Sequence, residues 1–233
     1  MVELNENFIH ILLQERTTDS NLDIDPNTII PRHMKTLLDQ KSRTKAKAEV
    51  FTPVSVVKKM NDAFDINYII GYEDYIDRKV LEATCGEAPF LTTRYDVATG
   101  QQIPCGDRVG LLDRKLQRIP NDIGTDEWLS LAIRSLKATY GYEWQEDSIF
   151  LARKNLLLNV IEYYMDRFGE SPNQDVIEDW ATIISYNIFR MNGVTLCIPE
   201  TNIKSRVMNW ETNMMENFDG RKDALAEVEQ QLF

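Results

Sequence analysis

The chain has 233 residues, a length that suits one sizeable α/β domain and is too short for two full enzymatic domains. Its hydrophobic and charged fractions, 43% and 27%, are ordinary for a soluble globular protein, and apolar runs such as Ile149–Ala152 are far shorter than a membrane span. The net charge of -11 argues against indiscriminate binding of nucleic acid, which depends on neutralising phosphates with Lys and Arg.

The N-terminus lacks the basic stretch and apolar core of a secretion signal, so we expect a cytoplasmic protein with no membrane partner. The three cysteines, Cys85, Cys105 and Cys197, are scattered and have no Cys-x-x-Cys or His pairing. They therefore indicate reduced thiols, and neither a disulfide framework nor a metal site is expected.

The first 48 residues are expected to form an N-terminal helical segment, followed by the main domain over residues 49–233. Within residues 3–16, apolar side chains recur at helical spacing, which predicts an amphipathic helix. Pro31 is expected to open a second helix after a polar loop. A third helix is predicted over 54–64, with a proline at its start, where the missing N–H costs nothing.

A local basic segment lies between positions 41 and 59, where six basic residues stand against one acid, Glu49. The basic residues are Lys41, Arg43, Lys45, Lys47, Lys58 and Lys59. One interpretation is a solvated loop and helix start; the other is a strip that contacts the phosphates of DNA.

Strands and helices alternate along the rest of the chain. Strands are predicted over 79–83, 140–144, 194–198 and 207–210, and helices over 126–139, 148–168, 176–191 and 221–232. Residues 92–125 are irregular and punctuated by Gly and Pro. The alternation favours an open, mostly parallel sheet over a helical bundle.

Residues 81–91, Leu-Glu-Ala-Thr-Cys-Gly-Glu-Ala-Pro-Phe-Leu, form the most informative stretch, because a strand there runs into a turn of small residues. In a doubly wound fold a cofactor lies at this point, where small residues let the backbone approach a ligand. A purely structural turn around Gly86 is the alternative.

This stretch resembles the cofactor loop of the gamma-type amino-methyltransferases of DNA, which runs Leu-Glu-Pro-Ala-Cys-Gly-x-Gly-x-Phe-Leu. Upstream, Phe-Thr-Pro at 51–53 resembles the helix start that contacts the methionine end of S-adenosylmethionine in that family. Ala88 stands in place of the second glycine. The resemblance implies cofactor contacts for Phe51, Thr52, Pro53, Thr84, Cys85, Gly86, Ala88 and Phe90.

Residues 140–145 resemble the second strand of the same family, whose acidic end accepts hydrogen bonds from the ribose hydroxyls of the cofactor. Glu143 would take that role, which suits an acceptor-only carboxylate, and Trp144 would flank the adenine ring. The alternative is that Glu143 is a surface charge and Trp144 a core aromatic.

The sequence departs from the family in its spacing. Glu143 follows Gly86 at nearly three times the interval of about 20 residues that is usual in Rossmann folds. Residues 92–139 are therefore expected to be an insertion after the cofactor loop, with a helix of its own.

A second departure concerns catalysis, because the sequence has no Pro-Pro and so lacks the family's Asn/Asp-Pro-Pro-Tyr/Phe motif. That motif holds an adenine flipped out of the duplex. The nearest substitute is Asn209, which would bond the amine, followed by Trp210, which would stack on the base. An ordinary turn at these two residues is the alternative.

The resemblance, which spans about 49–160, implies a Rossmann-like class I methyltransferase sheet that binds S-adenosylmethionine and methylates N6 of adenine in DNA within a restriction-modification system. Two alternatives remain open: an inactive methyltransferase-fold scaffold of a restriction or phage-defence system, and an interaction protein without a cofactor. Since the chain is too short for a conventional target-recognition domain, we expect a protein partner or homo-oligomer to supply target recognition.

Overall fold

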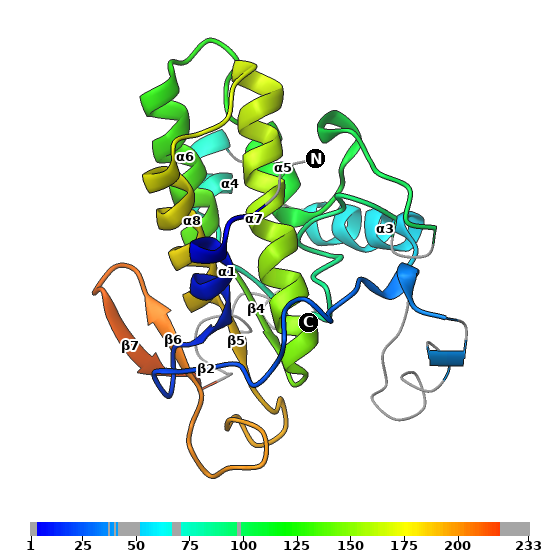
Figure 1. The fold of residues 1–233 in the computed structure, drawn as a ribbon. Coiled ribbons are helices and arrows are strands. Elements are labelled where there is room, and N and C mark those ends of the chain that lie inside the picture. Colours follow the sequence, from blue (N-terminus) through cyan, green and yellow to red (C-terminus); the bar gives the residue numbers. More distant parts are fainter. Residues whose placement is uncertain are drawn as a thin grey trace.

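The computed structural model describes residues 4–36, 38–39, 41, 52–66, 71–96 and 99–219. In this part of the chain, helices pack around a small parallel sheet, and the fold is of the mixed α/β class (Figure 1). The sheet consists of β3 (Val80–Glu82), β4 (Thr139–Glu143) and β5 (Ile188–Arg190), in the order β3-β4-β5. The expectation of a parallel sheet is confirmed for these three strands.

The register of the strands brings their carboxyl ends together. Glu82 lies opposite Gly141, and Glu143 lies opposite Arg190. Because parallel strands point the same way, the loops that leave the three strands begin at one side of the sheet, which we call the carboxyl edge. The residues that precede the strands share the opposite side, the amino edge.

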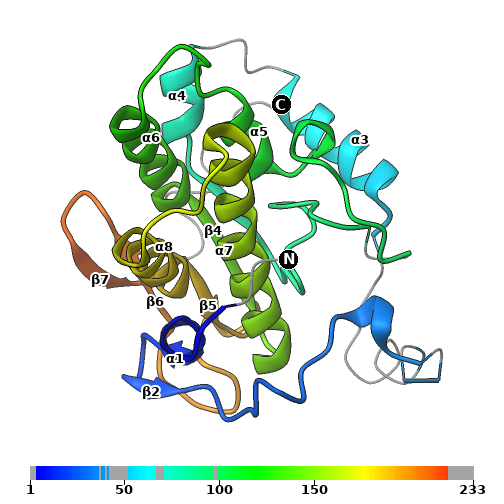
Figure 2. The same ribbon diagram turned by 45° about the horizontal axis from the view of Figure 1, so that its top comes forward.

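Three long helices stand side by side and pack beside the sheet (Figures 1 and 2). They are α6 (Thr125–Lys137), α7 (Glu146–Phe168) and α8 (Gln174–Asn187). The pair α7 and α8 forms the crossover that a parallel pairing of β4 with β5 requires. Trp128 of α6 meets Trp180 of α8 edge-on, with ring centroids 6.3 Å apart, so aromatic side chains fill the core between these helices.

The N-terminal helix α1 (Glu6–Leu13) begins at Asn5, whose side chain accepts a hydrogen bond from the backbone N–H of Phe8. Phe8 and Leu12 are buried in the same core as α7 and α8. The short elements that follow are β1 (Gln14–Glu15), β2 (Ser20–Asn21) and the 3₁₀ turn η1 (Arg32–Met34). The first predicted helix is thus confirmed. The helix expected after Pro31 begins as the 3₁₀ turn η1, and the described residues 38, 39 and 41 beyond it are also helical.

The remaining helical elements are α3 (Val54–Asp65), α4 (Tyr72–Asp77), η2 (Cys105–Asp107) and α5 (Leu111–Gln117). Helix α3 lies on the other side of α7 from α8 (Figures 1 and 2). Residues 92–139 contain both α5 and α6, so the region between β3 and β4 holds more helix than the sequence predicts.

Near the end of the described chain, β6 (Arg206–Asn209) and β7 (Met214–Asn217) form an antiparallel hairpin. A strand at 207–210 is predicted, but its pairing with β7 is not. The predicted helix over 221–232 lies outside the described residues.

The helix predicted over 176–191 ends four residues early, at Asn187, and Ile188–Arg190 forms β5 instead. The amide of Asn187 donates to the backbone oxygens of Leu136 and Thr139 at 2.8 and 3.0 Å, which fixes the chain where the helix ends. Ile188 is buried, and its β-branched side chain suits the sheet. Tertiary contacts therefore override the helical spacing.

The strand predicted over 194–198 is wrong, because these residues form turns that leave the carboxyl edge. Val194 is 91% exposed, and Leu196 has a φ of 58°, which an extended strand does not allow. The apolar, β-branched composition of this stretch had indicated a buried strand.

Candidate functional site

The loop that leaves β3 takes an unusual backbone path along the carboxyl edge. Thr84, Gly86 and Ala88 have φ values of 49°, 54° and 62°, so three alternate residues lie in the left-handed region. The backbone N–H of Cys85 donates to the backbone oxygen of Tyr142 at 2.9 Å and ties the loop to β4. Left-handed conformations at non-glycine residues cost about 1 kcal/mol each or more, so the surrounding structure must hold this path.

Glu82, at the end of β3, holds the far end of this loop. Its two carboxyl oxygens accept the backbone N–H groups of Phe90 and Leu91 at 3.3 and 3.2 Å. Burial of this side chain raises the pKa of its carboxyl to about 8. Glu82 matches a position of the family's loop, but the sequence does not indicate that its side chain binds the backbone of Phe90 and Leu91.

Glu143, at the end of β4, joins the same loop to the start of α7. One carboxyl oxygen accepts the backbone N–H of Gly86 at 2.8 Å, and the other accepts those of Trp144 and Gln145 at 2.7 and 3.1 Å. A negative charge is stabilised at this helix N-terminus. The structure therefore brings Gly86 and Glu143, which are far apart in sequence, into direct contact.

Open space borders this contact. A Cβ atom built on Gly86 would meet no other atom within 4 Å. A hollow of about 400 Å³ opens at the carboxyl edge, lined in part by Trp144 and Gln145, the two residues that follow Glu143, and we call it the edge hollow. Trp144, which is 40% exposed, forms part of its wall. A flat aromatic face at the border of a hollow can stack on a planar ring.

The edge hollow is acidic. Asp23, Glu146, Asp147 and Glu200 line it, against the single cation Arg190. Arg190 pairs with Glu146 at 2.6 Å and Lys35 pairs with Asp147 at 3.9 Å, so two of the four acids are compensated and Asp23 and Glu200 leave the lining negative. The lining therefore favours a cationic or hydroxyl-bearing ligand and opposes a phosphate-bearing one.

The N-terminal segment supplies one wall of this region. The backbone N–H of Asp23 donates to Glu146 at 2.9 Å, and that of Arg32 donates to Glu87 in the loop at 2.7 Å. The hydroxyl of Tyr95 donates to the other carboxyl oxygen of Glu87 at 2.6 Å. Asp23 and Glu87 could not be assigned to this region from the sequence, because no local pattern shows that residues so distant in the chain meet here.

The Phe-Thr-Pro motif at 51–53 is only partly described, since Phe51 lies outside the described residues. Pro53 precedes α3, as predicted, and its backbone oxygen accepts the N–H groups of the first turn. The contact between α3 and the loop lies further along the helix. There the amide of Asn61 donates to the backbone oxygens of Phe90 and Val109 at 3.1 and 3.0 Å.

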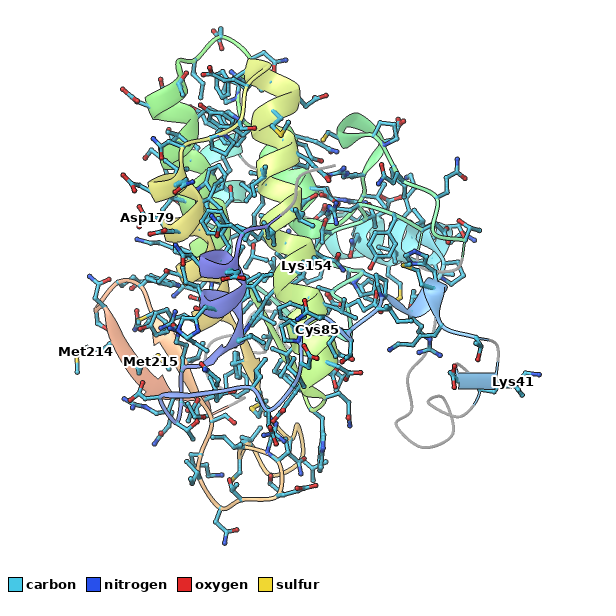
Figure 3. The ribbon with its side chains drawn as sticks, viewed as in Figure 1. Lys41, Cys85, Lys154, Asp179, Met214 and Met215 are labelled. Atoms are coloured by element: carbon cyan, nitrogen blue, oxygen red, sulfur yellow. The ribbon has the colours of Figure 1, made fainter. Side chains whose placement is uncertain are left out.

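The basic segment is also described in part. Lys58 and Lys59 are exposed on α3, and Lys41 projects from the N-terminal region far from Cys85 (Figure 3). The remaining members, Arg43, Lys45 and Lys47, lie outside the described residues.

Asn209 and Trp210 lie at the opposite side of the sheet from the loop. The indole N–H of Trp210 donates to the side chain of Asn187, which precedes β5, at 2.8 Å. The neighbouring Glu211 pairs at 2.9 Å with Lys79, which precedes β3. Both contacts place the tip of the hairpin at the amino edge, and Figure 3 shows Met214 and Met215 well apart from Cys85.

The hydrogen bonds of Asn209 are used within the hairpin itself. Its amide nitrogen donates to Glu216 at 3.0 Å, and its side-chain oxygen accepts the backbone N–H of Glu211 at 3.0 Å. A strand of five residues spans about 16 Å, so the structure does not bring Asn209 and Trp210 together with Glu143.

Within the described ranges, no group of three or more His, Cys, Asp or Glu side chains is placed to hold a metal ion. The helices built from those residues include none with the length and apolar character needed to span a bilayer. Comparison of the chain with protein-family models, curated proteins and solved structures gives no match.

Proposed function

We propose that the chain binds S-adenosylmethionine at the carboxyl edge and acts as a methyltransferase-like protein of a restriction-modification system, with a Rossmann-like arrangement of its sheet. The observation that supports this most is the contact between the N–H of Gly86 and Glu143, which directly precedes Trp144 in the wall of the edge hollow. A glycine turn after one parallel strand and an acid after the next is the arrangement that nucleoside cofactors use in doubly wound folds.

The residues present fit this cofactor. A carboxylate has about four acceptor positions, and Glu143 already receives three N–H bonds. The oxygen that accepts only Gly86 can therefore still accept a ribose hydroxyl. Trp144, which is 40% exposed in the wall of the edge hollow, could stack on adenine, and the acidic lining suits the positive charge of a sulfonium.

The cofactor would supply a methyl group on its sulfonium sulfur, ready for transfer to a nucleophilic nitrogen. The chain's own contribution is to bind and orient, since the loop between Glu82 and Leu91 fixes the backbone that faces the ligand. In this proposal the acceptor is the N6 amino group of an adenine in DNA. The binding site for this adenine would come from a protein partner or a second copy of the chain, because Asn209 and Trp210 lie at the amino edge.

The second candidate is a cofactor-binding scaffold that transfers no methyl group. Two observations favour it: the sequence has no Pro-Pro motif, and the hydrogen bonds of Asn209 are used within the hairpin. Methyl transfer, rather than cofactor binding, separates the two candidates.

Calorimetric titration with S-adenosylmethionine and S-adenosylhomocysteine tests the proposal. We expect Glu143→Ala to weaken binding about tenfold or more, since a hydrogen bond to a charged group contributes about 1.5–3 kcal/mol. Gly86→Val should abolish binding, because the new side chain fills the open space and strains a residue with a φ of 54°. Glu127→Ala, an exposed acid on α6, is the matched control and should bind like the wild type.

Circular dichroism establishes that each variant is folded. Binding by the wild type without transfer of a labelled methyl group to DNA would select the scaffold. No binding of either compound by the folded wild type would refute both candidates and leave an interaction protein.

A further inference from the structure

A second hollow, of about 430 Å³, lies between α3, η2 and α5, and we call it the basic hollow. Its lining includes four cations, Lys58, Arg108, Arg114 and Arg118, and one acid, Asp107. The whole chain has a net charge of -11, so this gathering of positive charge contrasts with the rest of the molecule. Concentrated positive charge at a hollow attracts anions.

The carboxylates that pair with these cations are shared, so they cancel only part of the positive charge. Asp62 binds both Lys58 and Arg114, each at 2.7 Å. Asp65 binds Arg114 at 2.8 Å and also Arg78 at 3.0 Å. Three cations, Lys58, Arg114 and Arg78, thus share these two carboxylates, which compensate at most two of the three positive charges.

Arg108, which lies beneath the surface of the basic hollow, also shares its carboxylate partner with a second cation. It is buried, with 7% of its surface exposed, and donates to Glu162 and Asn159. Glu162 is shared with a second arginine, Arg94. Arg108 is therefore a fixed positive charge whose own hydrogen bonds are satisfied.

Arg118 has side-chain hydrogen-bond donors for which the described residues show no acceptor. Its guanidinium carbon lies 3.3 Å from the centroid of the Tyr75 ring. Tyr75 is itself buried, and its hydroxyl donates to Asp65 at 2.8 Å. Stacking fixes the plane of the guanidinium and leaves its N–H edge available. Among the residues that the structure describes, no carboxylate pairs with Arg118.

We propose that the basic hollow binds a phosphate group, held by the N–H edge of Arg118 and the ammonium of Lys58, with Arg114 and Arg108 adding fixed charge. A guanidinium matches two phosphate oxygens at once, and a lysine adds a mobile point charge. The phosphate comes either from the backbone of DNA or from a free phosphate-bearing molecule. The site shares no lining residue with the edge hollow, so it does not depend on cofactor binding there.

The first arm of the test measures binding of a fluorescently labelled DNA duplex by anisotropy, at several salt concentrations and without S-adenosylmethionine. Arg118→Gln and Lys58→Gln should each weaken binding at least about threefold and reduce the slope of log K against log salt by about one, as expected for one lost phosphate contact. Lys137→Gln is the matched control, because Lys137 is a cation stacked on Trp210 at the amino edge. It should behave like the wild type.

The second arm titrates inorganic phosphate and ATP into the same proteins by calorimetry. Binding in this arm that Arg118→Gln loses, with no binding of DNA, would assign the site to a free phosphate-bearing molecule. Thermal melts establish that the variants are folded. The proposal is overturned if the folded hollow variants match the wild type in both arms, or if the wild type binds none of the three probes.

Discussion

Lys115 shows how strongly this fold can perturb a single ionisable side chain. It is buried on α5, and its ammonium donates to two backbone oxygens, those of Arg78 and Ala138. Burial, helped by the charge of Arg78, lowers the pKa of Lys115 from 10.5 to about 7. Near neutral pH the folded chain therefore starts to lose a proton that the unfolded chain keeps.

The lowered pKa makes stability depend on pH. Between about pH 7 and 10.5 the unfolded chain binds more protons at Lys115, so this residue makes the free energy of unfolding rise with pH. From pH 7 to 9 the gain is about 2 kcal/mol, at ~1.4 kcal/mol for each pH unit. In Lys115→Met this contribution disappears.

Urea denaturation of both proteins at pH 7, 8 and 9 measures the effect. The difference in unfolding free energy between wild type and Lys115→Met should shift in favour of the wild type as the pH rises. Lys59→Met, at an exposed position on α3, should show no such shift. A constant difference across the three pH values would mean that Lys115 titrates alike in both states.

At the scale of elements, one arginine on α7 connects this helix to α1, α8 and β5. The buried guanidinium of Arg153 on α7 donates to Leu12 and Gln14 at the end of α1, to Ser185 on α8 and to Ile188 in β5. All four acceptors are backbone oxygens, so removing the guanidinium leaves several of them unsatisfied in the interior.

We expect Arg153→Met to lower the free energy of unfolding by about 3–5 kcal/mol, because it leaves buried polar groups without partners. Lys154→Met is the control, since Lys154 is the next residue on α7 but lies at its surface (Figure 3). Its effect should stay within about 0.5 kcal/mol. Urea denaturation gives both values, and faster amide exchange in α1 would locate the loss; equal effects of the two variants would contradict this role.

The hairpin of β6 and β7 also has a role that a variant can isolate. Trp210 holds the hairpin against α8 through its indole N–H and its edge-on contact with Tyr186. We expect Trp210→Phe to lower the free energy of unfolding by about 1 kcal/mol, the usual loss for one hydrogen bond. Calorimetry should find unchanged affinity for S-adenosylhomocysteine, and a large loss of affinity in a folded variant would place Trp210 in the site after all.

Elements that have strong local patterns were predictable from the sequence. Helix α7 ends at Phe168, as predicted, because Gly169 adopts a φ of 73° after it. The boundary between α8 and β5 was not predictable from the sequence. It depends on the amide of Asn187, which donates to backbone oxygens near β4 that are distant in sequence. Within the candidate site, Gly86 and Glu143 were found from motifs, whereas Asp23 reaches the edge hollow only through the tertiary fold.

At the scale of the whole molecule, the two hollows carry opposite charges and therefore favour different ligands. The edge hollow is lined by four acids and one arginine, and the basic hollow by four cations and one acid. A ligand without phosphate is favoured at the first and a phosphate at the second. Since the edge hollow combines segments near residues 23, 144 and 200, only the folded chain can form it.

A ligand that binds only the folded chain raises its melting temperature by mass action. S-adenosylhomocysteine at about 100 times its dissociation constant would add about 2.7 kcal/mol of stability. For a chain of this size that corresponds to a rise in melting temperature of roughly 5–10 °C. The rise should persist in Arg118→Gln, which alters only the basic hollow, and should fall to about half or less in Glu143→Ala, because a tenfold weaker affinity leaves about 1.4 kcal/mol of stabilisation. If Arg118→Gln abolished the rise while Glu143→Ala kept it, the ligand would lie in the basic hollow and the assignment of the two hollows would be reversed.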